Sequence, residues 1–436
     1  MNPDTIFALA SGRPPAAVAV IRVSGPAAGT ALDRLTGTRR PPAREARLRT
    51  LRNPETGEYL DRALILWFPG PRNFTGEDAL EFHLHGGRAV IEAVSRALTG
   101  VGLRPAEPGE FSRRAFLNGR MDLTAAEGIA DLVAAETAAQ RRQALRATEG
   151  HMAEQLDAWR EEIKALLARW EAWVDFVDED DVPESAPDPT AIMRLRDAVG
   201  AALADERAGE RLRDGFRVAV LGPPNAGKST LVNRLAGRDA SIVTATAGTT
   251  RDVVEVHLDL DGYPVVVADT AGLRDAEEAI EAEGVRRARR TADAADLWLV
   301  VLDATDGARW PEELPEAEGT VLTVVNKADA APGVWRVDGH NVSAATGEGM
   351  DAVVEALGAR VATALAPGEV SGITRERHRA ALRETHAALD RAAHGTVAEL
   401  VAEDLRIAAT TLGRITGRMD VEEILDRVFR DFCIGK

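Results

Sequence analysis

A run of glycines, a lysine and a serine in the middle of the chain has the spacing of a phosphate-binding loop. The stretch RVAVLGPPNAGKSTLVNRL contains an apolar strand, a G-x-x-x-x-G-K-S loop and a helix in direct succession. Gly222 and Gly227 permit a close approach of the backbone, whose N–H groups can wrap a pyrophosphate at the helix N-terminus. Lys228 reaches the β- and γ-phosphates, and Ser229 is a ligand for Mg²⁺. The flanking strand and helix favour nucleotide binding over a glycine-rich turn that binds nothing.

Later motifs indicate the base and the metal partner. The motif DTAG, residues 269–272, ends an apolar strand and predicts that Asp269 lies near the Mg²⁺ shell. The motif NKAD, residues 326–329, follows another apolar strand, and we expect a buried carboxylate at Asp329. Such a carboxylate accepts hydrogen bonds from N1–H and the 2-amino group of guanine, which adenine does not offer together. With SAAT starting at Ser343, the order resembles the translation-factor-like GTPases and indicates GTP over ATP.

The groups that would promote hydrolysis are less obvious. Leu273 follows DTAG where Ras-type GTPases carry the glutamine that orients the attacking water, and leucine forms no hydrogen bond. The motif GTTRD supplies Thr250 as a switch threonine for Mg²⁺. It also contains Arg251, the one evident candidate for an arginine finger. Carboxylates that could act as the base follow Leu273, although each also fits a solvated helix charge: Asp275, Glu277, Glu278, Glu281 and Glu283.

A monovalent cation is another source of the positive charge that the transition state needs. Asn225 lies inside the phosphate loop, where its carboxamide oxygen either helps to hold K⁺ against the β- and γ-phosphates or bonds its own loop. Thr249 and the carbonyls of residues 244–248 offer further oxygen ligands. K⁺ bound there would do the electrostatic work of an arginine finger.

The elements that must position these residues change in character along the chain. Short strand-like runs around a helical stretch at residues 88–98 come first, followed by helices whose apolar residues recur at three- and four-residue steps. From residue 214 the chain alternates strands and helices in the manner of a doubly wound parallel sheet, and this region is the GTPase (G) domain. The helical pattern resumes after it. The pattern predicts a multidomain α+β protein with an α/β P-loop GTPase domain inserted into an all-α domain. The predicted boundaries are 1–117 for the N-terminal α+β domain, 118–213 and 366–436 for the helical domain, and 214–365 for the G domain.

Composition indicates a cytoplasmic multidomain protein. The 436 residues are too many for one core, and 45% hydrophobic with 28% charged residues is ordinary for globular proteins. A net charge of −17 argues against nonspecific wrapping of nucleic acid, so a nucleic acid must bind locally or through a partner. No apolar run is long enough to span a bilayer, and one cysteine excludes an intramolecular disulfide. The acidic stretch at residues 175–189 predicts a solvated loop, with a metal site as the alternative.

Motifs at both ends of the chain resemble those of one family. The GTPase motifs occur together with FTGEDALEFHLHGG, PGEFSRRAFLNGRMDLTAAEGIADL and LGRITGRMDVEEILDRVFRDFCIGK, a combination that resembles the MnmE (TrmE) family of tRNA uridine modification GTPases. The resemblance implies a homodimer formed through the N-terminal domain, which binds a tetrahydrofolate one-carbon donor in the 5,10-methylene or 5-formyl form. It also implies an FAD-containing partner, MnmG, with FAD on that partner only. Together they would add a carboxymethylaminomethyl or aminomethyl group to C5 of the wobble uridine of certain tRNAs, in a cycle driven by K⁺-dependent GTP hydrolysis.

The resemblance also implies roles for individual residues. The catalytic carboxylate falls to Glu281. The implied metal ligands are Ser229 and Thr250 for Mg²⁺, and Asn225, Thr244, Thr246 and Thr249 for K⁺. The implied GTP contacts are Asn225, Ala226, Gly227, Lys228, Ser229, Thr230, Thr244, Ala245, Thr246, Ala247, Gly248, Thr249, Thr250, Asp269, Thr270, Ala271, Gly272, Asn326, Lys327, Asp329, Ser343, Ala344 and Ala345. The implied folate ligands are Arg22, Glu81, Arg120 and Lys436.

A folate site at these residues is chemically sensible. One carboxylate, here Glu81, can accept from both the ring N–H and the amino group of a pterin, whereas arginine or lysine suits the glutamate tail. Without a ligand, Glu81 would be an exposed charge on an alternating strand. Arg120 stands where relatives often have lysine, which keeps the charge but changes the donor geometry. The tail DFCIGK would dock at this site, with Lys436 as a ligand and Cys433 close to the one-carbon chemistry.

Two other classes of protein share some of these features. A ribosome-assembly GTPase switch has the same kind of phosphate loop and a residue like Leu273, but such proteins usually append a basic RNA-binding module that neither flank of this G domain carries. A prenylated signalling GTPase would use Cys433, yet Gly435 and Lys436 do not fit a prenylation motif. Both classes therefore explain less of the sequence than the tRNA-modifying family does.

Overall fold

The computed structural model describes most of the chain as two compact units. The described residues are 4–176, 187–204, 206–237, 254–269, 292–311, 321–331, 337–366, 373–419, 422–430 and 432–435. One unit comprises residues 1–130, 147–167 and 406–436, and the other comprises residues 131–146 and 168–405. The three-domain division expected from the sequence stays a prediction, since the boundaries between the two units fall within helices of the helical domain.

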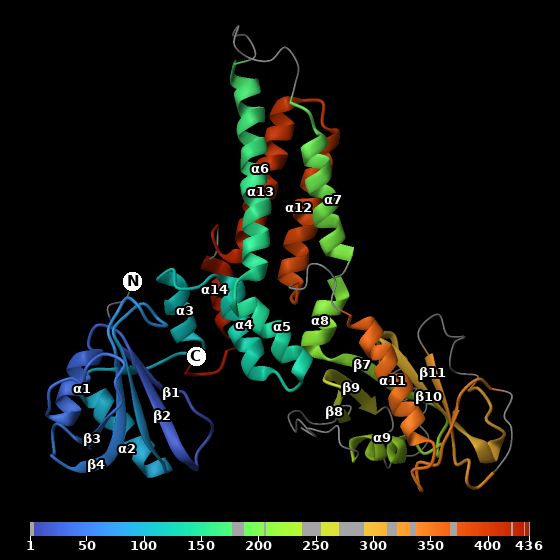
Figure 1. Cartoon of the computed structure of the whole chain (residues 1–436), viewed down its shortest axis with the longest axis horizontal. Helices are drawn as coiled ribbons and strands as arrows, with labels where there is room; N and C mark the ends of the chain where they lie inside the picture. The colour runs from blue at the N-terminus through green and yellow to red at the C-terminus, as the bar shows by residue number, and fades with distance from the viewer. Residues whose placement is uncertain are drawn as a thin grey trace, which may run out of the picture. The chain divides into compact units, whose positions relative to one another are not determined.

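The first unit contains a six-stranded sheet with the order β3-β4-β5-β2-β1-β6 (Figure 1). Neighbouring strands are antiparallel except for β6, which runs parallel to β1. Alternation of apolar and polar residues puts one face against two helices, α1 (Ala28–Thr36) and α2 (Arg88–Gly100), as expected for residues 88–98. The strands are β1 (Ile6–Leu9), β2 (Ala16–Ser24), β3 (Arg47–Arg52), β4 (Tyr59–Phe68), β5 (Ala79–Gly86) and β6 (Arg104–Pro105).

A chain of ion pairs ties β1 to the helix α3 (Glu110–Leu117). The guanidinium of Arg114, whose side chain is 10% exposed, contacts the carboxylates of Asp4, Glu77 and Glu110 at 2.7, 3.2 and 3.0 Å. Arg104 pairs with both Asp4 and Glu110. Because each carboxylate has arginine partners, the network holds the start of α3 against the edge of the sheet.

Helices complete the first unit and carry the end of the chain. The helices α4 (Leu123–Ala134) and α14 (Glu422–Arg430) join through an apolar cluster that includes Leu123, Phe429 and Phe432. The first part of α6 (His151–Phe176) and the last part of α13 (Ala398–Thr416) belong to this unit as well. On α6 the expected stripe is confirmed, because its apolar residues are buried from Leu156 to Trp170.

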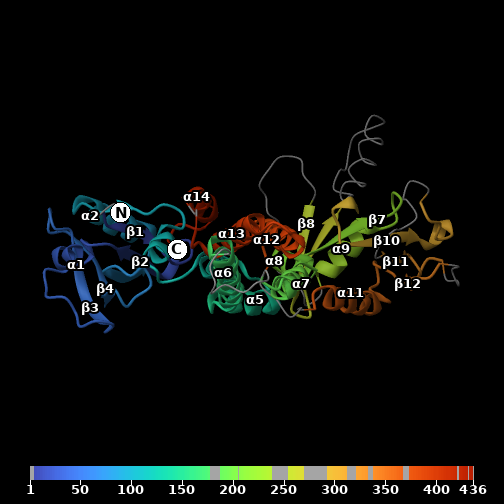
Figure 2. The same cartoon turned by 90° about the horizontal axis from the view of Figure 1, so that it is seen from above.

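The second unit joins helices to the G domain. The helices α7 (Thr190–Ala204) and α12 (Glu376–His394) lie side by side in Figures 1 and 2. The helix α8 (Glu206–Asp214) leads directly into the first strand of the G domain. The helix α5 (Ala138–Thr148) lies beside the G domain and contacts its sheet through a hairpin described below.

The G-domain sheet has the strand order β12-β11-β10-β7-β9-β8. It is parallel, as expected, except at its edge, where β8 forms an antiparallel hairpin with β9. The helices α9 (Lys228–Ala236) and α11 (Met350–Ala364) bury their apolar residues with one face of the sheet, and residues that include Ala292 and Ala304 cover the other. The strands are β7 (Phe216–Leu221), β8 (Val254–Leu260), β9 (Tyr263–Asp269), β10 (Leu297–Asp303), β11 (Val321–Asn326) and β12 (His340–Asn341).

None of the helices in the described part of the chain has the length and apolar character needed to cross a membrane.

Candidate functional site

The phosphate-binding loop has the backbone conformation that its sequence predicts. It connects β7 to α9, and Gly222 and Gly227 both have positive φ angles, of 142° and 89°. A Cβ at Gly222 would lie 2.1 Å from the carbonyl oxygen of Val301, and one at Gly227 would lie 2.3 Å from Nδ2 of Asn326. Both positions therefore require glycine, and the N–H groups at the start of α9 suit a phosphate.

Side chains of the loop already face its inner surface. Lys228 donates through Nζ to the carbonyl oxygens of Gly222 and Pro223, each at 2.8 Å, so its ammonium lies over the loop where phosphates would bind. Asn225 has a positive φ of 61°, which asparagine tolerates better than most residues, and its side chain is exposed. Ser229 is exposed at the first turn of α9, a position that fits a ligand of Mg²⁺.

Asn326 ties the base-recognition motif to the phosphate loop. Its buried carboxamide donates to the carbonyl oxygen of Ala226 at 2.8 Å and accepts from the N–H of Ala344 at 2.9 Å. The loop that starts at Ser343 is closed by its own hydrogen bonds, in which Thr346 N–H donates to Ser343 Oγ at 3.1 Å. Three predicted motifs thus meet around one side chain at the carboxyl end of the sheet.

Lys327 and Asp303 form an ion pair that the sequence analysis missed. Lys327 Nζ lies 2.7 Å from Asp303 Oδ2. Burial alone would raise the pKa of Asp303, but hydrogen bonds from Lys327 and Thr305 outweigh it and lower the pKa below its ordinary value. The available signal was a carboxylate ending an apolar strand, VVLD, next to the strand that precedes NKAD.

Asp329 differs from the expectation. We expected a buried carboxylate, but Asp329 is exposed, because it lies in the turn beyond the end of β11 rather than within the sheet. An exposed carboxylate at the sheet edge can still reach a guanine that approaches from solvent. Its role in base recognition stays a prediction.

Much of the predicted hydrolytic machinery lies outside the described residues. This applies to the loop 244–250 with its K⁺ and Mg²⁺ ligands, to residues 270–272 and to Glu281. For Asp269 the structure gives the backbone at the end of β9. Among the described residues no cluster of three or more His, Cys, Asp or Glu side chains could hold a metal ion. The metal and catalytic assignments stay predictions.

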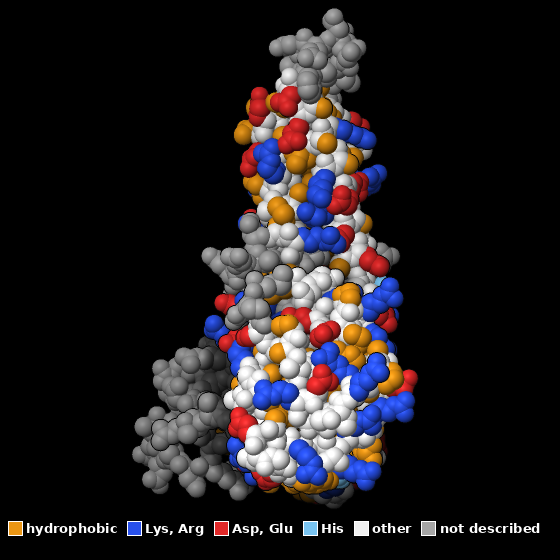
Figure 3. Space-filling view, turned by 90° about the vertical axis from the view of Figure 1, so that its left-hand side faces the viewer, with side chains coloured by type: hydrophobic (Ala, Val, Ile, Leu, Met, Phe, Trp, Pro, Cys, Tyr) orange, Lys and Arg blue, Asp and Glu red, His pale blue; other side chains and the backbone are white. Residues whose placement is uncertain are grey.

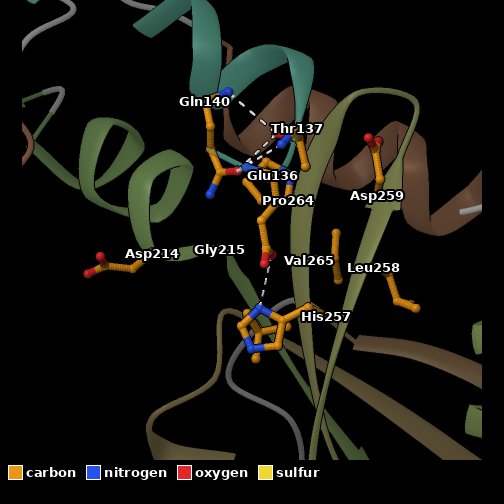
Figure 4. Close-up of a pocket in the computed structure, with 11 residues that line it drawn as sticks. Glu136, Thr137, Gln140, Asp214, Gly215, His257, Leu258, Asp259, Pro264 and Val265 are labelled. Atoms are coloured by element: carbon orange, nitrogen blue, oxygen red, sulfur yellow. Dashed lines mark hydrogen bonds and ion pairs between the residues drawn. The ribbon is translucent and has the colours of Figure 1, made fainter. Parts of the chain in front are cut away.

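The β8–β9 hairpin joins the nucleotide site to the helical part of the same unit. The carbonyl oxygen of Gly262, in the turn of the hairpin, accepts from the N–H of Ala139 at 2.9 Å. The carboxylate of Glu136 points toward His257 on β8, with 3.6 Å between Oε2 and Nδ1 (Figure 4). Gln140 caps the start of α5 by accepting from the N–H of Thr137 at 3.0 Å. Glu136, Thr137, Gln140 and His257 contribute to the lining of a small pocket of about 20 Å³.

A second junction fixes the two points where the chain enters and leaves the G domain. Asp131 Oδ1 contacts Arg213 Nε at 3.3 Å and Arg375 Nη2 at 2.7 Å. Arg213 also donates through Nη1 to the carbonyl oxygen of Thr374 at 3.2 Å. Arg213 directly precedes the G domain and Arg375 follows it, so one carboxylate holds both crossings together.

The predicted folate ligands Arg22 and Glu81 lie opposite each other on adjacent strands of the N-terminal sheet. Nε and Nη2 of Arg22 donate to Oε1 of Glu81 at 3.2 and 3.1 Å. Nε2 of His83 lies 3.2 Å from the other oxygen, Oε2. His83 lies two residues after Glu81 on β5, so strand alternation puts both side chains on the same face, although sequence reasoning assigned His83 no role.

Aromatic rings and a loop extend this group of residues. The Arg22 guanidinium lies over the rings of Phe74 and Phe111, at 5.6 and 5.9 Å from their centroids. Arg120 is exposed and donates through Nε to the carbonyl oxygen of Asn73 at 3.1 Å. The loop that contains Asn73 and Phe74 thus links two of the predicted ligands, with a flat aromatic surface beside them.

The tail of the chain docks on the same domain. Ile434 forms an antiparallel bridge with Pro108, and Gly109 N–H donates to the carbonyl oxygen of Cys433 at 3.4 Å. Gly435 has a φ of 99°, and a Cβ there would lie 2.4 Å from the carbonyl oxygen of Leu9. Cys433 has an exposed thiol, while Lys436 lies outside the described residues.

Comparison with known proteins covers the chain from end to end. A family model described as the MnmE helical domain matches residues 123–433, and one described as the GTP-binding protein TrmE N-terminus matches residues 5–120. A protein of Rhodospirillum rubrum named tRNA modification GTPase MnmE is 55% identical over 457 residues, covering 100% of each chain. One of the same name from Methylorubrum populi is 56% identical over 440 residues, covering 99% of this chain and 98% of the relative.

Solved structures give a weaker likeness. The G domain of the FeoB iron transporter of T. maritima matches 34% of this chain and 98% of its own, at 24% identity and a TM-score of 0.25, which is too low to bear on function. The sequence relatives, in contrast, match this chain over nearly its full length. The chain belongs to the MnmE (TrmE) family of tRNA modification GTPases.

Proposed function

We propose that this GTP hydrolase, together with an FAD-containing MnmG partner, adds a carboxymethylaminomethyl or aminomethyl group to C5 of the wobble uridine of certain tRNAs. The observation that supports this most is the combination in one chain of a phosphate-binding loop with an N-terminal domain that pairs Arg22 with Glu81 and receives the tail. A GTPase that acts only as a switch has no need for the second feature. The bound tetrahydrofolate would supply the one-carbon unit, and we expect the protein to work in the cytoplasm.

In the GTPase step, the loop N–H groups and Lys228 hold the phosphates, and the Ser229 hydroxyl is a ligand for Mg²⁺ together with Thr250. The proposed K⁺ ligands are Asn225 and Thr249 side chains with the Thr244 and Thr246 carbonyls. Glu281 is proposed to take the proton from the attacking water, since Leu273 cannot orient it. Asn225 supports the cation proposal because it is exposed within the loop.

The hydrolytic proposal is tested by turnover in different salts. We expect GTP turnover to be much faster in K⁺ than in Na⁺, because a K⁺ ion placed by Asn225 replaces an arginine finger. Glu281→Ala should reduce turnover by about 10²- to 10⁴-fold while leaving GTP affinity nearly unchanged. Glu355→Ala, the same change at an exposed position on α11, serves as the matched control. Equal rates in the two salts would remove the cation from the mechanism.

The folate proposal assigns Glu81 to the pterin edge, with Arg22, Arg120 and Lys436 as the cationic ligands. Arg22 now occupies Oε1 of Glu81 and His83 lies beside Oε2, so the carboxylate is held in place by both neighbours. A pterin would stack on an aromatic surface of the kind that Phe74 offers, 38% exposed. The exposed Cys433 thiol is proposed to lie close to the one-carbon chemistry.

A homodimer through the N-terminal domain is proposed from the open face of its sheet. Leu48 and Leu64, which pair across β3 and β4, are 49% and 38% exposed on the face opposite α1 and α2. Val18 on β2 is 53% exposed. A second copy of this domain would cover these apolar side chains.

The modification proposal is tested by nucleoside mass spectrometry of tRNA from a strain that lacks the gene. We expect the wobble-uridine modification to disappear and to return with the intact gene. A gene without the last six codons should not restore it, because the tail contributes Cys433 and Lys436, although the purified variant should hydrolyse GTP normally. Unchanged modification in the deletion strain would contradict the proposed function.

A further inference from the structure

Charge is divided unevenly along the chain. Residues 1–117 contain sixteen arginines, no lysine and twelve carboxylates, whereas residues 118–436 contain 37 basic and 58 acidic side chains. Within the basic domain, residues 34–52 alone contain seven arginines and a single glutamate. A partner with many negative charges would be repelled by most of the molecule and attracted to this one segment.

The structure gathers this segment at one edge of the N-terminal sheet. It comprises the last turn of α1, the loop 37–46 and the strand β3, which is the terminal strand and pairs with β4 on one side. The helix α1 packs against β3, so the two arginine-bearing elements are neighbours. Figure 3 faces the side on which α1 and β3 lie, and the blue side chains spread over the surface of this domain are arginines, since the domain contains no lysine.

Among the described residues, most of these arginines have no carboxylate partner. Arg40 pairs with Asp33 at 2.9 Å, and Arg47 pairs with Glu45 at 2.5 Å. The other five have no carboxylate partner within the described residues, and we call them the arginine edge. The arginine edge consists of Arg34, Arg39, Arg44, Arg49 and Arg52.

Hydrogen bonds orient part of the arginine edge without cancelling its charge. Arg44, Arg49 and Arg52 donate to the backbone carbonyl oxygens of Arg72, Leu48 and Gly57, respectively. Arg34 and Arg39 are exposed and make no hydrogen bond to other described residues. Arg49 is half-buried with its Nε inside, but the other four arginines are exposed and keep donors available at the surface.

Two simpler explanations account for less. Charged residues protect a sheet edge from pairing with other strands, but Arg34, Arg39 and Arg44 lie outside the strand and would add nothing to that. Pairing of two copies edge to edge would bring like charges together, which is unfavourable. The arrangement fits an extended anionic partner better than either.

We propose that the arginine edge binds the phosphate backbone of the tRNA. Arginine suits phosphate because its planar guanidinium donates two parallel hydrogen bonds. Contacts of this kind fix the position of the RNA without reading its sequence. The inference rests on the proposed function in that it takes the anionic partner to be tRNA.

Binding of the full-length protein to an unmodified tRNA transcript tests the proposal. The double variant Arg34→Gln, Arg39→Gln should weaken affinity about tenfold and make the plot of log K against log salt shallower by one to two units over about 50 to 200 mM salt. Both side chains are exposed and unpaired, so the fold should be unaffected, with GTP hydrolysis as the check. The matched control is Arg88→Gln, Arg96→Gln on α2, which also removes two charges from the same domain and should change affinity by less than about twofold.

Four other outcomes would overturn the proposal. Equal losses in the two double variants would mean that net charge alone matters. Unchanged RNA binding in the Arg34, Arg39 variant would exclude the arginine edge. Loss of binding to phosphatidylserine vesicles without loss of RNA binding would assign the surface to a membrane, and an altered oligomeric state would assign it to a protein interface. If the strain lacking the gene kept its tRNA modification while the RNA-binding result held, the proposed function would fail and this inference would stand as RNA binding.

Discussion

At the scale of single residues, Arg114 is the side chain on which the N-terminal domain depends most. It is nearly buried and contacts three carboxylates from different segments, so its loss leaves Asp4 and Glu110 with Arg104 alone and removes the cation that pairs with Glu77 among the described residues. We expect Arg114→Met to lower the free energy of unfolding by about 3 kcal/mol. Urea denaturation followed by circular dichroism would measure it.

Its neighbour provides the control. Arg113 pairs with Asp426 at 3.1 Å, but that carboxylate is 66% exposed, so Arg113→Met should cost less than about 1 kcal/mol. If the two variants were equally stable, the ion pairs of Arg114 would contribute no more than surface ones.

The same network gives the domain a defined response to acid. Burial would raise the pKa values of Asp4 and Glu110, but hydrogen bonds from Arg104 and Arg114 outweigh it, so both pKa values fall below their ordinary values of 3.8 and 4.5. Near these values the unfolded chain therefore binds more protons than the folded one. The stabilisation is complete above pH 4.5 and is lost as the pH falls through the lowered folded values.

Glu110→Gln isolates this effect. It should cost about 2 kcal/mol at neutral pH, because Arg104 and Arg114 lose a charged acceptor. Its stability should then fall less steeply than that of the parent protein between about pH 5 and pH 3. Denaturation series at several pH values would compare the slopes. Parallel curves would show that Glu110 titrates alike in the folded and unfolded states.

At the scale of elements, the contact of the tail with Leu9 depends on one glycine. Gly435 has a positive φ and approaches the Leu9 carbonyl too closely for any side chain, so Gly435→Ala should release the tail from the domain. Cys433 is the chain's single cysteine, so a spin label attached there would report greater mobility without further substitutions. Modification of tRNA should fall with it, while GTP hydrolysis should not.

Gly12→Ala is the matched control, because a Cβ at Gly12 would meet nothing within 4 Å. It should leave both the label and the modification unchanged. A label of equal mobility in Gly435→Ala would mean that the tail is fixed by Phe432 and the helix before it rather than by this contact.

The junction at Asp131 is the element that should transmit the state of the G domain. Its carboxylate contacts Arg213, where the chain enters the G domain, and Arg375, where it leaves. The β8–β9 hairpin nearby begins after the GTTRD motif and ends in the DTAG motif. Asp131→Asn keeps the size but removes the charge, and should loosen the junction. We expect GTP turnover to change less than about twofold and tRNA modification to fall about tenfold. The control is Asp214→Asn, which removes a carboxylate next to Arg213 in the chain rather than the one whose oxygen contacts both arginines. Equal effects of the two variants would argue against transmission through Asp131.

The fold and site could be predicted from the sequence only where the signal is local. The glycines of the phosphate loop, the strands that end in DTAG and NKAD, and the stripe on α6 depend on residues a few positions apart. The pairing of Arg22 with Glu81 joins residues 59 positions apart, and the docking of the tail on Gly109 joins still more distant ones. Such contacts depend on strand order and register, which one sequence does not state.

Two local expectations also needed the structure. Asp329 follows an apolar strand, but the strand ends at Asn326, so the carboxylate falls in an exposed turn. The edge strand β8 has the same apolar alternation whether it runs parallel or antiparallel to β9, and the tight turn at Gly262 decides for antiparallel.

At the scale of the whole molecule, one feature of the G domain has a practical consequence. Its entry and exit are joined by the contact of Arg213 with the carbonyl oxygen of Thr374. A segment whose two ends lie close together can be replaced by a short linker, because joining the two ends costs the remaining chain little conformational entropy. A short Gly/Ser linker between residues 214 and 373 should give a chain that still folds its N-terminal domain and helices but no longer binds GTP. Such a chain would keep the N-terminal and helical domains, with the proposed tRNA-binding surface, but would not respond to nucleotide. If it failed to fold, the G domain would also be needed for the stability of the helical domain.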